Sequence, residues 1–165
     1  MGIITEINGV AFINDSKATN VDAVQKALLS VPRLSGAGAN VWLIAGGRDK
    51  GFEYHDLGPL LSQRVKGAFL IGEAREKIQA AWGLFTPCRL VDSLLEAVQR
   101  AAQSAVAGDV VLLSPACSSF DQFRNYQHRG EVFRQAVAAL QQTALSSPPA
   151  PGHKHNRNGS VEVTA

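Results

Sequence analysis

The sequence predicts an α/β fold with a doubly wound, mostly parallel sheet and an antiparallel edge strand. Short apolar runs recur along the 165 residues, and segments with helical spacing of apolar residues separate them. Because the runs do not alternate between apolar and polar residues, we expect strands buried on both faces. An Asn8-Gly9 pair between two strand-like runs predicts a tight hairpin, which supplies the antiparallel strand.

The first two strands are expected at Ile4–Ile7 and Val10–Ile13, on either side of that turn. A helix is expected after Thr19, because apolar residues then recur at i, i+3 and i+7 and share one helical face. These residues are Val21, Val24 and Leu28. Thr19 or Asn20 is a suitable cap for this helix, since each side chain offers an oxygen to the first unpaired N–H groups.

Further strands and helices alternate along the rest of the chain. The strands are expected at Val41–Ala45, Ala68–Ile71, Cys88–Val91 and Val110–Leu113. The helices between them are expected at about Leu57–Arg64, Glu73–Trp82 and Ser93–Val106, the last opened by a Ser93-x-x-Glu96 capping box. A final helix is expected to carry Val132, Phe133, Ala136, Val137 and Leu140 on one face.

Composition limits the classes of function. The chain is 45% hydrophobic and 18% charged with a net charge of +2, as in ordinary globular proteins. No basic stripe interleaved with aromatic residues occurs, so nucleic acid is not an expected partner. No apolar run approaches 18 residues and no signal peptide is apparent, so we expect no membrane partner and a cytoplasmic location.

The cysteines, the histidines and the composition of the last twenty residues give further expectations. Cys88 and Cys117 lack Cys-x-x-Cys spacing, which favours a reducing compartment, and the histidines have no paired ligand, so no metal site is expected. Residues 1–145 are expected to form one domain. From Ser146 onward, Pro, Gly, Ser, His and Asn dominate, which predicts a disordered tail over 146–165.

Polar and reactive residues gather where three of the expected strands end. Asp15, Lys17 and Thr19 follow one strand, Gly46 to Gly51 follow another, and Ser114 to Asp121 follow a third. Because parallel strands end at the same edge of a sheet, these segments are expected to face one cleft, where open α/β sheets bind ligands. No segment fits the G-x-x-x-x-G-K-[ST] pattern of a P-loop.

Each piece also has a simpler interpretation. Asp15 and Ser16 would suit a plain turn, and Gly46-Gly47 would suit a bend between a strand and a helix. Lys50 would suit a solvated position in a loop. Cys117 is expected to be a packed small thiol rather than a nucleophile, since no histidine lies in a partner motif. Phe123 is expected in the core, a role that also suits Tyr126. The backbone N–H groups of Ser114–Asp121 are candidates for an anion-binding nest.

Three segments resemble one family. They are Asn14-Asp15-Ser16-Lys17-Ala18-Thr19-Asn20, Gly46-Gly47-x-x-Lys50, and Ser114-Pro115-Ala116-Cys117-x-Ser119-x-Asp121-Gln122-Phe123 with Asn125 and Arg129-Gly130. The resemblance is to the Rossmann-like carboxy-terminal domain of Mur ligases that add D-glutamate to UDP-N-acetylmuramoyl-L-alanine in peptidoglycan synthesis. It covers about Thr5 to Leu140. Sister ligases usually differ where this chain has Asp15-Ser16-Lys17, which favours the glutamate-adding branch.

The resemblance implies roles for individual residues. Thr19 and Lys50 would hold one carboxylate of D-glutamate. Ser119, the Phe120 region and Tyr126 would hold the other, although the family more often has Leu at position 120 and Phe at position 126. Asp15 would contact the ribose of ATP. Lys17 would lie near the phosphates or the reacting centre.

The resemblance also implies that two domains of the family's ligases have no counterpart here. Family members activate the muramoyl-alanine carboxylate as an acyl phosphate with ATP, and the amine of D-glutamate then attacks it. Their UDP-binding domain and their central ATPase domain, which would hold most of the magnesium, have no counterpart in these 165 residues. We therefore expect a fragment or split piece that is inactive alone. The alternatives are a freestanding small-ligand-binding module of the same fold and, more remotely, a folate-type glutamate ligase domain.

Overall fold

A single six-stranded sheet forms the centre of the molecule. The computed structural model describes residues 2–32 and 38–146. The strands are β1 (Gly2–Ile7), β2 (Val10–Asn14), β3 (Val41–Gly46), β4 (Val65–Ile71), β5 (Cys88–Leu90) and β6 (Val110–Leu113). They lie in the order β1-β2-β6-β3-β4-β5. Only β1 is antiparallel to its neighbour among these strands, which confirms the predicted fold class.

The amino-terminal hairpin follows from its turn residues. Asn8 and Gly9 both adopt positive φ, at 52° and 81°. This left-handed pair matches the twist of the two flanking strands, as Asn-Gly turns do. The turn pairs Ile7 with Val10 and sets the register of β1 on β2, with one irregularity between Ile3 and Thr5. The hairpin prediction is confirmed.

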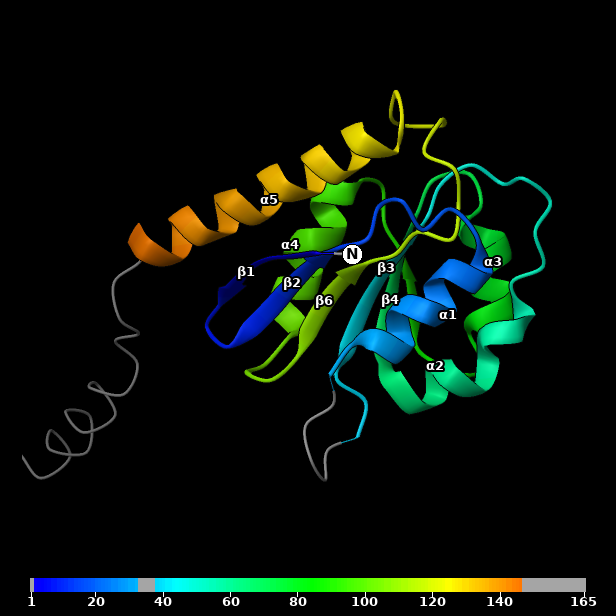
Figure 1. Ribbon diagram of the computed structural model, residues 1–165, viewed down its shortest axis with the longest axis horizontal. Helices are drawn as coiled ribbons and strands as arrows, with labels where there is room; N and C mark the ends of the chain where they lie inside the picture. Colours follow the sequence, from blue (N-terminus) through cyan, green and yellow to red (C-terminus); the bar gives the residue numbers. More distant parts are fainter. Residues whose placement is uncertain (1, 33–37, 147–165) are drawn as a thin grey trace, which may run out of the picture.

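Helices cover both faces of the sheet (Figure 1). Their bounds are α1 (Val21–Ser30), α2 (Gly58–Arg64) after the 3-10 turn η1 (His55–Leu57), α3 (Arg75–Trp82), α4 (Leu94–Ser104) and α5 (Tyr126–Ser146). The buried residues form two clusters. One includes Val24 of α1, Leu61 of α2 and Ile78 of α3; the other includes Val98 of α4 and Phe133 of α5.

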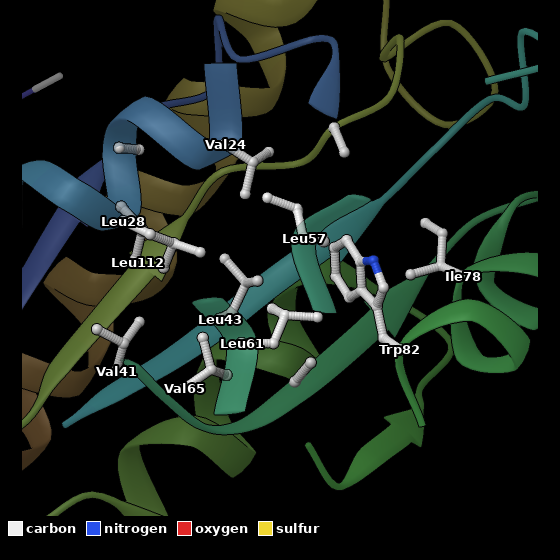
Figure 2. Packing of buried hydrophobic residues seen from close by; sticks show 14 of the residues in the cluster. Val24, Leu28, Val41, Leu43, Leu57, Leu61, Val65, Ile78, Trp82 and Leu112 are labelled. Carbon is white, nitrogen blue, oxygen red and sulfur yellow. The ribbon is translucent and has the colours of Figure 1, made fainter. Parts of the chain in front are cut away.

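The first cluster packs against the sheet, and Trp82 lies at one side of it beside Leu57 and Ile78 (Figure 2). Its indole ring is fully buried and its Nε1 donates a hydrogen bond to the carbonyl oxygen of Tyr54 at 2.8 Å. Leu43 of β3 and Leu112 of β6 point into the same cluster from the sheet. This packing fixes the strand ends and so fixes where the loops that follow them begin.

Helix ends agree with the capping residues in the sequence. The Asn20 side chain accepts from the Ala23 N–H at 2.8 Å, so Asn20 rather than Thr19 caps α1. Ser93 accepts from the Glu96 N–H, and Glu96 accepts in turn from the Asp92 N–H, one residue before the position expected of a capping box.

Several boundaries differ from the sequence-based expectation, among them the start of β4 at Val65 rather than Ala68 and the start of α3 at Arg75 rather than Glu73. Helix α4 ends at Ser104 rather than near Val106, because the Val106 N–H donates to the Asp109 carboxylate in a turn. Helix α5 begins at Tyr126 and continues through Ser146, so position 146 belongs to the helix and not to the tail. The rest of the predicted tail, 147–165, lies outside the described residues.

Candidate functional site

Backbone hydrogen bonds join the three polar loops at the carboxyl edge of the sheet. The Ala116 N–H donates to the Ala18 carbonyl oxygen at 2.9 Å, which ties the loop after β6 to the loop after β2. The Gly46 N–H donates to Pro115 and the Arg48 N–H donates to Ser118, both at 2.9 Å, which ties the loop after β3 to the same segment. The predicted convergence of these three segments is therefore present.

The loop after β2 is buried on one side and exposed on the other. Asp15 and Ser16 are each only 5% exposed. The Ser114 hydroxyl donates to Asp15 Oδ2 at 3.1 Å, and burial raises the pKa of the Asp15 carboxyl above its ordinary value, against the opposing effects of Ser114 and Lys17. Lys17 is exposed and Thr19 is half-buried. The Ala18 N–H donates to the Asp15 carbonyl oxygen and closes a turn, as the simpler interpretation expects, but the same loop also bonds to the loop after β6.

Arg129 of α5 lies at the centre of the three loops. It is fully buried, and its guanidinium donates to the Ser16 hydroxyl (Nε, 3.0 Å), the Ser16 carbonyl (2.6 Å) and the Cys117 carbonyl (2.9 Å). The Ser16 hydroxyl in turn donates to the Tyr126 carbonyl at 2.7 Å. A single side chain thus connects the loop after β2, the loop after β6 and the start of α5.

The loop after β3 approaches this centre through Gly47. Gly47 has a φ of +143°, and a Cβ there would lie 2.4 Å from the Ser118 carbonyl oxygen and 3.4 Å from the Arg129 guanidinium. Only glycine permits this approach. Farther along the loop, Lys50 is exposed, with its Nζ 5.6 Å from the centroid of the Phe52 ring.

Helix α3 and the loop before it brace the Lys50 loop. Glu73 Oε1 accepts from the Asp49 N–H at 3.0 Å, while the Glu73 N–H donates to Asp121 Oδ2 at 3.0 Å. Asp49 also accepts from the Gly51 N–H, which lowers the pKa of the Asp49 carboxyl, and Lys77 acts in the same direction. The segment after β4 therefore links the Lys50 loop to the loop after β6.

The loop after β6 carries the remaining candidates. Ala116 adopts a φ of +63°, an uncommon value for a residue with a side chain, and it is fully buried against the other loops. The Ser119 side chain is nearly buried, whereas Phe120 is 63% exposed and Tyr126 is 42% exposed. Tyr126 is thus not a core aromatic, while Phe123 packs partly buried against the second core cluster, as expected.

Two pockets meet at Lys17. One, of about 390 Å³, has a polar lining that includes Asn14, Ser16, Lys17, Tyr126 and Arg134. The other, of about 330 Å³, is lined by Asp15, Lys17, Ala18, Ala23, Lys26, Ala27 and Ser30. Among the predicted site residues, Lys17 and Tyr126 share the first pocket, and Asp15 and Lys17 share the second. Thr19, Lys50, Ser119 and Phe120 line neither of these two pockets, although their loops join the same edge.

Cys117 is a packed thiol, as predicted. It is fully buried and lies 3.3 Å from the Tyr54 hydroxyl. Burial raises the pKa of the Cys117 thiol to about 11, so the reactive thiolate is scarce at neutral pH. Within residues 2–32 and 38–146, no three His, Cys, Asp or Glu side chains lie close enough to hold a metal ion. No helix in those ranges has the length and apolar character needed to cross a membrane.

Arg129 and Glu73 were given no role by the sequence-based reasoning. Arg129 stands in one of the segments that resemble the family, and that position was its only signal. The sequence predicts Glu73 only as the start of a helix, and the structure contradicts this, since α3 begins at Arg75. A buried arginine and a bridging glutamate become recognisable only when the loops they join are seen together. The partners of Arg129 lie 113 and 12 residues away, and those of Glu73 lie 24 and 48 residues away.

A protein-family model described as "Mur ligase, glutamate ligase domain" matches residues 1–117. Among curated proteins, the chain is 49% identical over 141 residues to a UDP-N-acetylmuramoylalanine–D-glutamate ligase from Syntrophotalea carbinolica, covering 86% of the chain and 30% of that protein. It is 48% identical over 140 residues to the ligase of the same name from Geobacter metallireducens, covering 85% of the chain and 29% of that protein. The chain thus spans about a third of the length of these relatives.

Solved structures share the fold at low sequence identity. The UDP-N-acetylmuramate-alanine ligase from Thermotoga maritima superposes with a TM-score of 0.58 at 15% identity, over 86% of this chain and 30% of that one. A murein peptide ligase from Psychrobacter arcticus gives a TM-score of 0.53 at 14% identity, over 91% of this chain and 30% of that one. At such identities the likeness concerns the fold alone.

Proposed function

Because the chain belongs to the Mur ligase, glutamate ligase domain family, we propose that it carries the D-glutamate site and part of the ATP site of a ligase that extends UDP-N-acetylmuramoyl-L-alanine with D-glutamate. The observation that carries the proposal is the joining of three loops by backbone hydrogen bonds at one sheet edge. These loops hold Lys17, Thr19, Lys50 and Ser119. Relatives at 48–49% identity bear that ligase's name, which supports the assignment of the substrate.

The chemistry of D-glutamate suits these loops. At neutral pH the amino acid presents two carboxylates, which require cations and oriented hydrogen-bond donors. Lys50 offers a mobile ammonium, and Thr19 and Ser119 offer hydroxyls. Hydrogen bonds in which one partner is charged are roughly twice as strong as neutral ones. The exposed rings of Phe120 and Tyr126 would close over the carbon chain between the two carboxylates.

The nucleotide would lie on the other side of Lys17. Asp15 lines the pocket of about 330 Å³, where its carboxylate offers an acceptor to ribose hydroxyls. Lys17 and Lys26 line the same pocket and would attract phosphate groups. These residues therefore fit the ribose and phosphates of ATP. Magnesium would be held mainly by the other ligase domains, because no group of three His, Cys, Asp or Glu side chains among the described residues of this chain could hold a metal ion.

The chain's contribution to ligation would be orientation. Holding the amine of D-glutamate beside an activated carboxyl carbon converts a bimolecular encounter into an oriented one, worth up to about 7–11 kcal/mol in favourable cases. The activation itself requires a triphosphate site, and these 165 residues contain no P-loop pattern. We therefore propose that the chain works with the other ligase domains in the cytoplasm and is inactive without them.

A chimera tests this proposal. The matching third of the Syntrophotalea carbinolica relative is replaced by residues 1–146, and the product is assayed with ATP, UDP-N-acetylmuramoyl-L-alanine and D-glutamate. Ligase activity dependent on D-glutamate supports the proposal. A folded chimera with no activity, while the parent is active, would contradict it and favour a freestanding binding module. The isolated 165-residue chain should show no turnover in the same assay.

Variants of the chimera test the individual residues. Lys50→Ala and Ser119→Ala should each raise the KM for D-glutamate about tenfold or more, since a hydrogen bond to a charged group contributes about 1.5–3 kcal/mol. The KM for ATP should stay unchanged. Arg100→Ala is the control, because Arg100 pairs with Glu96 on α4 and has no part in the three loops. Unaltered D-glutamate dependence in both variants would refute the assigned pocket.

A further inference from the structure

Arg129 is a buried positive charge without a buried counterion. Its three hydrogen bonds go to a hydroxyl and two carbonyl oxygens, all neutral acceptors. No Asp or Glu oxygen among the described residues lies within the 4.0 Å of a salt bridge with it. Burial lowers the pKa of the Arg129 guanidinium only to about 10, so the group stays charged at neutral pH.

Such a charge is costly unless something compensates it. A buried ion normally requires a paired ion of opposite sign, and hydrogen bonds to neutral groups replace only part of its hydration. At neutral pH the Asp121 carboxylate favours the charged form of Arg129 without forming a salt bridge with it. No carboxylate among the described residues pairs with the guanidinium directly, so the surrounding loops lie in its positive potential.

Those loops are the ones proposed to hold the ligand. Ser16, which accepts two of the three hydrogen bonds, lines the same pocket as Lys17 and Tyr126. Cys117, the third partner, lies two residues before Ser119. The Gly47 approach places the Lys50 loop beside the same guanidinium. Every segment proposed to bind a carboxylate thus contacts Arg129 or stands next to a residue that does.

We infer that Arg129 is a positioning residue that makes this site selective for a ligand with two carboxylates. Its hydrogen bonds hold the loop after β2 against the loop after β6, and its buried charge favours the ligand with the greater negative charge. Arg129 is fully buried, so it acts through its neighbours and does not touch the ligand. This inference rests on the proposed D-glutamate site and adds the origin of its charge selectivity.

The experiment compares D-glutamate with D-glutamine, which has nearly the same shape and lacks one carboxylate. Each is titrated into the 165-residue chain and followed by two-dimensional NMR, with wild type, Arg129→Lys and Arg129→Gln. Wild type should prefer D-glutamate. Arg129→Gln should lose about tenfold or more of that preference, since a charge in a partly desolvated site acts over several ångströms. Arg129→Lys keeps the charge and should keep the preference while lowering the melting temperature.

The outcomes separate charge from mere structural support. Equal weakening of both ligands in Arg129→Gln, with the preference intact, would overturn the inference and leave Arg129 a structural residue. Loss of the preference in Arg129→Lys would also overturn it, since that variant retains the charge. If Arg129→Gln fails to fold, Arg129→Lys decides: a preference lost although the charge is kept contradicts the inference. No D-glutamate binding by the wild type would instead defeat the proposed site itself.

Discussion

Replacing Gly47 by alanine should destabilise the protein far more than the same change at Gly51. Both glycines lie in the loop after β3 and both have positive φ, +143° and +82°. They differ in what surrounds them. A Cβ at Gly51 meets no atom within 4 Å, whereas a Cβ at Gly47 lies 2.4 Å from the Ser118 carbonyl oxygen and 3.1 Å from the Cys117 Cβ. The pair therefore isolates the contact between the loops from backbone strain.

The expected costs follow from these contacts. Backbone strain alone should cost Gly51→Ala about 1–2 kcal/mol of unfolding free energy. In Gly47→Ala the Ser118 carbonyl must also move, which adds about 1–3 kcal/mol of overpacking. The same movement weakens the 2.9 Å hydrogen bond from the Arg48 N–H, a loss of about 1 kcal/mol. The total for Gly47→Ala is then about 3–6 kcal/mol, a large share of the stability of an ordinary domain.

Urea unfolding followed by circular dichroism measures both variants against wild type. The expected result is a midpoint for Gly47→Ala well below that of Gly51→Ala, with similar slopes. Equal midpoints for the two variants would mean that the loops after β3 and β6 do not pack as described. The arrangement of the whole candidate site would then be wrong.

Two further predictions concern buried titratable groups. Because burial raises the pKa of Asp15, the contribution of this carboxyl to stability is lost as pH rises through its folded-state pKa. Asp15→Asn should therefore raise the melting temperature at pH 7 more than at pH 4, and it should weaken ATP use by the chimera. A lower melting temperature of Asp15→Asn at pH 7 would contradict this. Cys117 has its pKa raised from 9.0 to about 11, so its stabilising contribution, roughly 3 kcal/mol, is complete below pH 9 and is lost as pH rises through 11. The free energy of unfolding of Cys117→Ala should thus fall less steeply with rising alkaline pH than that of wild type. The Cys117 thiol of the folded protein should resist a disulfide reagent at pH 8, and rapid labelling without unfolding would refute its burial.

The fold was predictable because local signals and the global topology agree. Asn8-Gly9 set the hairpin, Asn20 and Ser93 capped their helices, and continuous apolar runs gave the buried parallel strands. The errors lie at the ends of helices and strands. Helix α4 stops early because the Asp109 side chain, a tertiary partner, takes the Val106 N–H. Sequence periodicity alone does not contain that competition.

The candidate site was predictable as a gathering of loops but not as a network. Parallel strands end at one edge of a sheet, and this topology predicts that Lys17, Lys50 and Ser119 come from converging segments. The role of Arg129 did not follow, since a lone arginine in an amphipathic helix is usually solvated. Only packing against Ser16 and Cys117 turns it into a buried charge.

The most direct test of the account is a D-glutamate titration of the isotopically labelled wild-type chain. The account predicts that backbone amide signals of residues 15–20, 47–51 and 114–123 shift together and saturate at one ligand concentration, while those of the hairpin turn and α4 stay in place. Shifts confined to a single loop, or no shifts at D-glutamate concentrations that saturate the active chimera, would contradict the claim that three distant segments build one anion site.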